Sequence, residues 1–232
     1  LRWEPQDRKP LGEVVQVITA RNEADMAMKE ILLQHDFSLQ FDEDVLKETA
    51  ALNGAISETE LAKRKDFRQA LTFTIDPADA KDFDDALSIQ YLENNTYEIG
   101  VHIADVSHFV HPDSALDKTA YQRATSVYLP DRVNPMLPEK ISNELCSLRP
   151  HEDKYTFSAV FIINQKAEVK RVWIGRTVTH SDQRFSYEEV QESIENKTGK
   201  YGKEILLLND LAQKFRKKRF ANGAINFSSQ EV

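Results

Sequence analysis

Two β-rich segments joined by an acidic loop decide the fold: residues 71–92 read LTFTIDPADAKDFDDALSIQYL. The first segment, Leu71 to Ile75, is followed by Asp76-Pro77, and the second runs from Ala86 to Leu92. β-Branched and aromatic residues favour strands, and Asp-Pro favours a turn. We therefore predict two neighbouring strands with an acid-rich loop between them.

The surrounding sequence predicts a mixed α and β architecture. Asn94-Asn95 and Asn164-Gln165 favour hairpin turns between β-rich segments. Further strands are expected at residues 96–106, 155–163 and 169–178. Helices are expected at residues 24–36, 43–53, 57–66, 113–125 and 200–221, and after a cap at Ser186. We therefore predict an α+β fold with a mixed, mostly antiparallel sheet flanked by helices.

The chain divides into three predicted regions. Residues 1–21 hold two prolines and then a β-rich run from Gly12 to Ile18. One strand cannot stand alone, so we expect it to be the trailing strand of an upstream domain. Residues 22–66 are predicted to form a helical connector, and residues 67–232 carry the predicted sheet. Leu1 rather than Met opens the chain, so we expect a fragment of a longer protein.

The composition excludes several classes of protein. The net charge of −8 argues against a protein that holds nucleic acid by charge alone, unless metal ions or a local basic surface reverse the field. No apolar run approaches the roughly 18 residues of a membrane span, so we expect no membrane partner. Cys146 is the only cysteine, which excludes a disulfide framework and a cysteine-based zinc site. A reducing compartment suits such a chain, so we expect a cytoplasmic protein.

The loop between the two central strands concentrates negative charge. Five carboxylates lie within ten residues, and Lys81 is the only cation among them. Two carboxylates about 4 Å apart repel by roughly 4 kcal/mol at an effective dielectric constant of 20, so such a group needs protonation or a bound cation. Hard oxygen ligands favour Mg²⁺ or Mn²⁺, which support phosphodiester cleavage. The alternative is an acidic surface turn, which the apolar neighbours of the loop disfavour. The five are Asp76, Asp79, Asp82, Asp84 and Asp85.

The loop sequence resembles a known catalytic motif. Thr74-Ile75-Asp76 followed by Lys81 to Ala86 resembles the acidic motif of the ribonuclease II / ribonuclease R family, whose catalytic unit is the RNB domain. The resemblance implies that residues 1–21 end a cold-shock/OB-type domain and that residues 67–232 are the N-terminal half of an RNB domain. Further matches follow in the family's order at residues 102–107, 125–130, 135–138 and 145–148.

This resemblance implies a processive 3′→5′ exoribonuclease. Such an enzyme hydrolyses single-stranded RNA to nucleoside 5′-monophosphates with Mg²⁺, which Mn²⁺ can replace, and we expect a monomer. The family aspartates that organise the metal match Asp76, Asp82, Asp84 and Asp85. Asp84 matches the one most closely tied to catalysis, whereas Asp79 matches no family ligand.

The resemblance also implies aromatic contacts to RNA. Tyr128 matches a tyrosine that packs on the terminal nucleotide, and Phe227 matches a phenylalanine that stacks near the scissile end. An aromatic face holds any base with about 1–3 kcal/mol, without reading the sequence. The alternative for each is an ordinary core aromatic residue. Weaker candidates for RNA contact are Arg123, Arg132, Asn143 and Ser147.

Two other clusters are interpreted as structural. His102, His108 and His111 lie near Asp105, and we favour packing and hydrogen bonding over a transition-metal site. The basic run from Lys214 to Arg219 favours a solvated helix end over a phosphate contact.

One departure from the family weighs against activity of the chain alone. The later catalytic arginine of the family has no counterpart here, and such an arginine would neutralise charge in the transition state. We therefore expect the isolated fragment to be inactive or nearly so. The rival hypothesis is a non-catalytic RNA-binding or assembly module that retains the fold.

Overall fold

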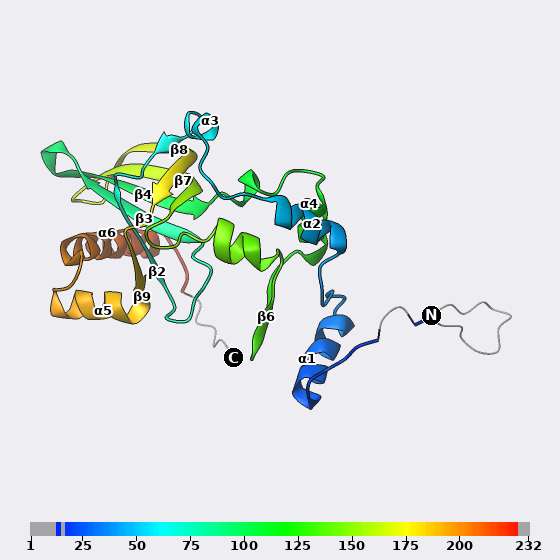
Figure 1. The fold of residues 1–232 in the computed structure, drawn as a ribbon. Coiled ribbons are helices and arrows are strands. Elements are labelled where there is room, and N and C mark those ends of the chain that lie inside the picture. Colours follow the sequence, from blue (N-terminus) through cyan, green and yellow to red (C-terminus); the bar gives the residue numbers. More distant parts are fainter. Residues whose placement is uncertain (1–12, 15–16, 227–232) are drawn as a thin grey trace.

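The computed structural model describes residues 13–14 and 17–226, and a seven-stranded sheet dominates this part (Figure 1). The strand order is β1-β8-β7-β4-β3-β2-β9. Neighbouring strands pair antiparallel except at the two edges, where β1 with β8 and β2 with β9 are parallel. The predicted α+β fold with a mostly antiparallel sheet is confirmed. The strands are β1 (Lys65–Asp66), β2 (Leu71–Asp76), β3 (Asp85–Tyr91), β4 (Thr96–Ala104), β7 (Asp153–Asn164), β8 (Val169–His180) and β9 (Gln183–Ser186).

The helices gather in two places around this sheet. Figure 1 shows α5 and α6 together beside the sheet and α2 and α4 together on its other side, with α1 farther from the sheet and α3 at the top of the view. A separate hairpin of β5 (Val127–Leu129) and β6 (Arg132–Asn134) and a π-helical turn (Lys140–Leu145) connect α4 to β7. The helices are α1 (Glu23–Gln34), α2 (Glu43–Ala51), α3 (Glu58–Leu61), α4 (Ala115–Arg123), α5 (Tyr187–Asn196) and α6 (Gly202–Ala221). None of the helices described here has both the length and the apolar composition of a membrane span.

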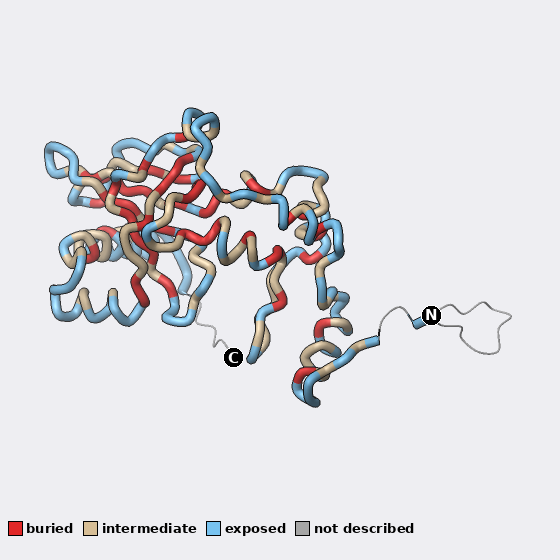
Figure 2. The backbone as a smooth tube through the Cα atoms, in the orientation of Figure 1, coloured by how far each residue is buried: buried red, intermediate tan, exposed pale blue. Residues whose placement is uncertain are grey.

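Apolar packing fixes the strands that carry the acidic loop. Phe73 of β2 belongs to a buried cluster with Ile205 of α6, and Ile89 of β3 belongs to another with Leu211 of α6. Each large apolar side chain that is fully buried contributes roughly 1.5–3 kcal/mol. Figure 2 shows the buried backbone concentrated in the sheet. The loop ends are therefore attached to a rigid base.

Several local predictions are confirmed. Asn94 and Asn95 form the turn between β3 and β4 with φ of 57° and 54°, a left-handed conformation that asparagine tolerates. Ser186 begins α5 in a capping box with Glu189. The long helix at the predicted residues 200–221 is α6, and Gly223 follows its end with φ of 94°.

Other boundaries were wrong. The helix predicted at residues 57–66 ends at Leu61, and Lys65-Asp66 instead pairs with β8, because the ladder at the sheet edge outweighs local helix preference. The strand predicted at residues 96–106 ends at Ala104, before a 3₁₀ turn (Val106–His108). The β5–β6 hairpin and β9 were not predicted, since strands of three or four residues carry little periodicity.

The two ends of the chain leave predictions open. Of the predicted leading strand, the described residues 13–14 and 17–18 lie in no strand, while the rest of it lies outside the described part. The assignment of residues 1–21 to an upstream domain therefore stays a prediction. Ile225 and Asn226 also lie outside any strand, and Phe227 falls beyond the described residues.

Candidate active site

The acidic loop runs from the end of β2 to the start of β3, so the hairpin brings Asp76 and Asp85 to one end of the sheet. Ser147 holds the loop through hydrogen bonds to its backbone. Its hydroxyl donates to the Lys81 carbonyl at 3.2 Å and accepts from the Phe83 amide at 3.0 Å. The Leu148 amide donates to the Phe83 carbonyl at 2.8 Å. Backbone bonds of this kind fix the loop without neutralising its carboxylates.

Arg184 of β9 secures the other side of the loop. Its guanidinium donates to the carbonyls of Pro77 at 2.6 Å and Ala78 at 2.9 Å, and lies 5.7 Å from the ring centre of Phe83. No sequence motif pointed to Arg184, which lies more than 90 positions from the acidic loop. The parallel pairing of β9 with β2 places it there.

The carboxylates raise one another's proton affinity. Burial raises the pKa of Asp76, the charges of Asp85 and Asp82 add to this, and the Thr74 hydroxyl and Arg184 oppose it. Asp76 is only 8% exposed, and its Oδ2 atom has no hydrogen-bond partner among the described residues. A buried oxygen without a donor is costly, and a cation would relieve that cost.

The pKa of Asp84, at the other end of the loop, is also raised. Partial desolvation raises its pKa, and the charges of Asp82, Asp85 and Asp76 raise it further. The backbone carbonyl of Asp84 accepts from the Ala104 amide at 2.9 Å, so this carboxylate projects from a fixed backbone. The four aspartates are thus electrostatically coupled.

The donor set suits a hard divalent cation, because it consists of carboxylate oxygens. Within the described residues, however, no group of three or more possible ligands is already arranged to hold an ion. The metal-binding roles of Asp76, Asp82, Asp84 and Asp85 therefore stay predictions. Side-chain rotation, which requires no change in the fixed backbone, would have to complete the site.

Tyr128 presents its ring to solvent, and its predicted contact with RNA stays a prediction. It lies in β5, directly opposite Val133 of β6, and is 72% exposed. A tyrosine in the core would be covered, so the alternative of an ordinary core aromatic residue does not hold here. The exposed ring is free to stack on a base.

Arg123 does not reach the surface. Its guanidinium donates to Asn134 Oδ1 and the Pro135 carbonyl, each at 3.2 Å, and to the Gln40 carbonyl at 2.7 Å. It also stacks 4.1 Å from the ring centre of Phe41. Because it is 6% exposed and satisfied internally, it braces the hairpin against the connector instead of presenting its charge to a phosphate.

Arg132 and Ser147 likewise have internal partners. Arg132 forms ion pairs with Asp25 of α1 and with Asp131, which occupy its guanidinium. Ser147 is fully buried beneath the loop, as described above. The predicted RNA contacts of Arg123 and Ser147 are corrected to structural roles, and that of Arg132 is weakened by its two carboxylate partners.

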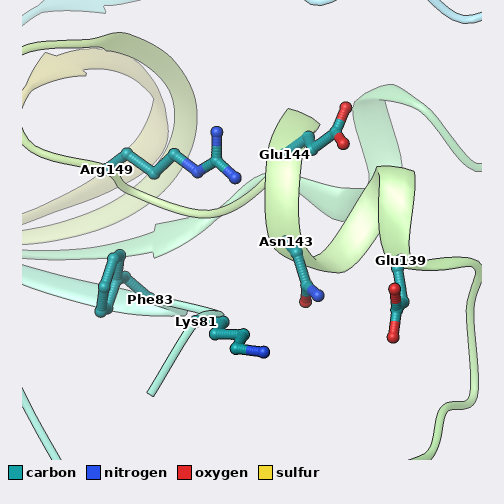
Figure 3. A pocket seen from close by; sticks show the side chains of 6 residues that line it. All are labelled: Lys81, Phe83, Glu139, Asn143, Glu144 and Arg149. Carbon is teal, nitrogen blue, oxygen red and sulfur yellow. The ribbon is translucent and has the colours of Figure 1, made fainter. Parts of the chain in front are cut away.

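Asn143 lines a surface pocket of about 440 Å³ that borders the loop (Figure 3). The residue is half-buried in the π-helical turn, and its Oδ1 atom accepts from the Ser142 hydroxyl at 3.0 Å. Its amide nitrogen remains available to a ligand. The pocket is lined by Lys81, Phe83, Glu139, Asn143, Glu144 and Arg149.

Within the predicted histidine cluster, His102 and Asp105 have structural roles. His102 is fully buried between the hydroxyls of Ser88 at 2.8 Å and Ser158 at 2.6 Å, and burial lowers its pKa to about 4. Asp105 forms a buried ion pair with Arg64 at 2.7 Å. The sequence did not predict the role of Arg64, because its partner lies 41 positions away in the chain.

Known proteins resemble this chain over most of its length. The family model of the RNB domain matches residues 64–232. The chain is 39% identical to DIS3-like exonuclease 2 of Schizosaccharomyces pombe, covering 100% of this chain and 27% of that protein. It is 40% identical to ribonuclease R 1 of Lactococcus lactis, covering 95% of this chain and 28% of that protein. The chain thus spans about a quarter to a third of the length of the curated relatives it matches.

Solved structures share the fold. Mycoplasma genitalium RNase R in complex with ribose-methylated single-stranded RNA superposes with a TM-score of 0.79 at 28% identity, over 89% of this chain and 33% of that one. Yeast Ssd1, described as a pseudonuclease, superposes with a TM-score of 0.75 at 22% identity, over 95% of this chain and 28% of that one; at that identity the likeness extends to the fold alone. The chain belongs to the RNB-domain family, whose named members here include ribonucleases and exonucleases.

Proposed function

We propose that the chain is part of a processive 3′→5′ exoribonuclease that hydrolyses single-stranded RNA to nucleoside 5′-monophosphates. The observation that carries the proposal is the acidic loop. Burial and the charges of neighbouring aspartates raise the pKa values of Asp76 and Asp84, and the buried Asp76 Oδ2 atom has no hydrogen-bond partner among the described residues. A fold of this kind hosts both active and inactive relatives, so the site and not the fold supports the activity.

Asp76, Asp82, Asp84 and Asp85 would hold Mg²⁺, which Mn²⁺ can replace. When bound, the metal polarises the phosphoryl oxygens and lowers the pKa of a water nucleophile. The protein supplies a fixed loop backbone, held by Ser147 and Arg184, that presents the carboxylates together.

The remaining proposed residues hold the RNA end. Tyr128 offers its exposed ring to a base, and Asn143 offers its amide at the pocket beside the loop. Phe227 would stack on a second base. Arg132 contributes to RNA binding only if its ion pairs with Asp25 and Asp131 open.

The proposal extends to the whole protein, since this chain covers about a quarter to a third of its curated relatives. We propose that the parent is a cytoplasmic monomer that binds single-stranded RNA without a membrane partner. The isolated chain is proposed to be inactive, because no arginine that could neutralise transition-state charge was identified in it.

The test is Asp84→Asn in the full-length protein. We expect RNA cleavage with Mg²⁺ to be abolished while RNA affinity stays within about twofold, since the change removes a metal ligand and little shape. Asp79→Asn is the matched control, because Asp79 lies in the same loop and matches no family ligand. A wild-type parent that binds RNA without cleaving it would favour the rival, a non-catalytic RNA-binding or assembly module.

A further inference from the structure

The hairpin that carries Tyr128 is separate from the main sheet. In the described part of the chain, β5 and β6 form a two-stranded sheet of their own. Three residue pairs join the two strands, and Tyr128 lies opposite Val133 in the middle pair. A two-stranded hairpin alone is at best marginally stable in water. Contacts with the rest of the molecule therefore decide where the Tyr128 ring lies.

The base of this hairpin is bonded to the segment between α1 and α2. The Asn134 side-chain amide donates to the Ser38 carbonyl at 3.3 Å, and the Arg123 guanidinium donates to the Gln40 carbonyl at 2.7 Å. Arg123 also donates to Asn134 Oδ1 at 3.2 Å, and both residues are buried. These bonds fix the end of the hairpin where β5 begins and β6 ends, but not its tip.

The tip of the hairpin is attached to α1 by an ion pair. Arg132, in the residue pair nearest the turn, donates to Oδ1 of Asp25, which lies 107 positions away in the chain. Its other carboxylate partner, Asp131, belongs to the same turn and cannot fix the hairpin to another element. Figure 1 shows β6 and α1 near each other, away from the seven-stranded sheet. Asp25 is therefore the contact through which α1 holds the tip.

Asp25 is itself fixed in the first turn of α1. Its side chain is 3% exposed, and its Oδ2 atom accepts from the Arg21 amide at 2.9 Å and from the Lys29 ammonium at 3.0 Å. Its amide donates to the side chain of Asn22, which caps the helix, at 2.8 Å. The charge of Asp25 is thus paired with Lys29 within α1 and does not depend on Arg132. Because a guanidinium–carboxylate pair is directional, the contact with Arg132 adds a fixed position of β6 against α1.

We propose that Asp25 is a positioning residue for RNA binding: through Arg132 it holds the β5–β6 hairpin so that the Tyr128 ring lies in place to stack on a base. A hairpin that is not held would have to be ordered when RNA binds, which lowers affinity. The inference rests on the proposed function, from which it takes the contact of Tyr128 with RNA. It adds a role for α1, which affects RNA binding through the hairpin.

A direct phosphate contact by Arg132 predicts the opposite result for Asp25→Asn. If Asp25 only kept Arg132 away from the RNA, removing its charge would free the guanidinium, tighten RNA binding and steepen its salt dependence. If Asp25 positions the hairpin, the same change weakens RNA binding and leaves the salt dependence unchanged, because no phosphate contact is lost. The sign of the change in affinity separates the two roles.

The experiment measures binding of a labelled single-stranded RNA to the full-length protein by fluorescence anisotropy, with EDTA present so that the RNA stays intact. We expect Asp25→Asn to weaken binding about fivefold, as when the binding-competent hairpin position falls to about a fifth of the population. In a protein that already carries Tyr128→Ala, Asp25→Asn should change affinity by less than about twofold, because the ring that it positions is absent. A merely structural role of Asp25 would not depend on Tyr128 in this way.

Glu23→Gln is the matched control, because Glu23 is exposed in the same turn of α1 and the change in net charge is the same. It should leave RNA affinity unchanged. Tighter or unchanged binding by Asp25→Asn, or an equal loss with and without Tyr128, overturns the proposal. Circular dichroism confirms that each variant is folded.

Arg132→Gln keeps the test decisive if Asp25→Asn fails to fold, since Asp25 then retains Arg21 and Lys29 as partners. We expect the same fivefold loss, the same dependence on Tyr128 and an unchanged salt dependence. A salt dependence shallower by about one ion, independent of Tyr128, would instead identify Arg132 as a phosphate contact.

The outcomes also separate this proposal from the proposed function. A full-length protein that shows the coupled loss of RNA affinity but does not cleave RNA with Mg²⁺ overturns only the proposed hydrolysis. A protein that cleaves RNA, and in which the effects of Asp25→Asn and Tyr128→Ala are independent, overturns only the positioning role.

Discussion

Two buried aspartates at strand ends, Asp105 and Asp76, have pKa values shifted in opposite directions. Asp105 follows β4, is 3% exposed, and pairs with the Arg64 guanidinium at 2.7 Å. Asp76 ends β2, is 8% exposed, and has no ion pair among the described residues. Burial alone would raise the pKa of both carboxyls. Their neighbours decide the difference.

At Asp105 the Ser107 hydroxyl and the Arg64 guanidinium outweigh burial, so the pKa is lowered. At Asp76 the carboxylates of Asp85 and Asp82 reinforce burial, so the pKa is raised. The charge of Asp105 therefore stabilises the fold, whereas the charge of Asp76 has no ion-pair partner among the described residues. Groups of the second kind cluster at functional sites.

The largest effect is expected from Arg64→Ala. The Arg64 side chain is fully buried, and removing it leaves the Asp105 charge buried without its partner. We expect a loss of about 3–5 kcal/mol in the free energy of unfolding, measured by urea denaturation. The neighbouring Lys63→Ala, at an exposed site, should change stability by less than about 1 kcal/mol. A comparable loss in both variants would mean that the ion pair is not the cause.

The next effect concerns Tyr128, whose ring is 72% exposed. Tyr128→Ala should weaken binding of single-stranded RNA by about 1–3 kcal/mol, the contribution of one stacked base, with stability unchanged. Fluorescence anisotropy of a labelled RNA measures the affinity. Tyr121→Ala is the control, because Tyr121 is 89% exposed on α4 and matches no family contact. Equal losses for both tyrosines would contradict a specific role for Tyr128.

Asp76→Asn should have the opposite sign to Arg64→Ala. Removing an unsatisfied charge should stabilise the metal-free chain by about 0.5–2 kcal/mol, as other substitutions that relieve functional strain do. Mg²⁺ should raise the melting temperature of the wild-type chain and not that of the variant. Asp79→Asn, in the same loop but exposed, should behave as the wild type does in both measurements. A destabilised Asp76→Asn chain would show that the fold needs this carboxylate.

The smallest effect is the pH dependence of the stability gained by Asp76→Asn. The folded pKa of Asp76 lies above the ordinary aspartate value of 3.8, so the folded chain binds the proton more tightly than the unfolded chain does. Its destabilising effect is therefore absent below pH 3.8 and grows as pH rises through the folded pKa. The stability difference between Asp76→Asn and wild type should grow as the pH rises above 3.8 and should level off once the pH has passed the folded pKa of Asp76. A constant difference across this window would argue against a raised pKa.

Much of the sheet could be predicted because its signals are local. The β-rich segments, the Asn94-Asn95 turn and the Ser186 cap each depend on a few adjacent residues. The acidic loop was predicted for the same reason. The short strands β1, β5, β6 and β9 were missed, because they exist through pairing with distant partners.

The candidate site shows more clearly what could not be predicted from the sequence. Arg123 was predicted to contact phosphate because the sequence shows its charge, yet the fold buries that charge against Gln40 and Asn134. Ser147 was predicted to contact RNA and instead supports the loop. Arg184, which does lie at the loop, was not predicted at all.

Short-range chemistry was sufficient to place five acids in one loop and to foresee strands on either side of it. The sequence alone could not show which charges are neutralised. An ion pair depends on side chains that distant strands bring within a few ångströms of each other. Arg64 reaches Asp105 across the sheet, whereas Asp76 meets mainly other carboxylates. That arrangement, invisible in the order of residues, makes Asp105 part of the scaffold and leaves Asp76 without an ion pair among the described residues.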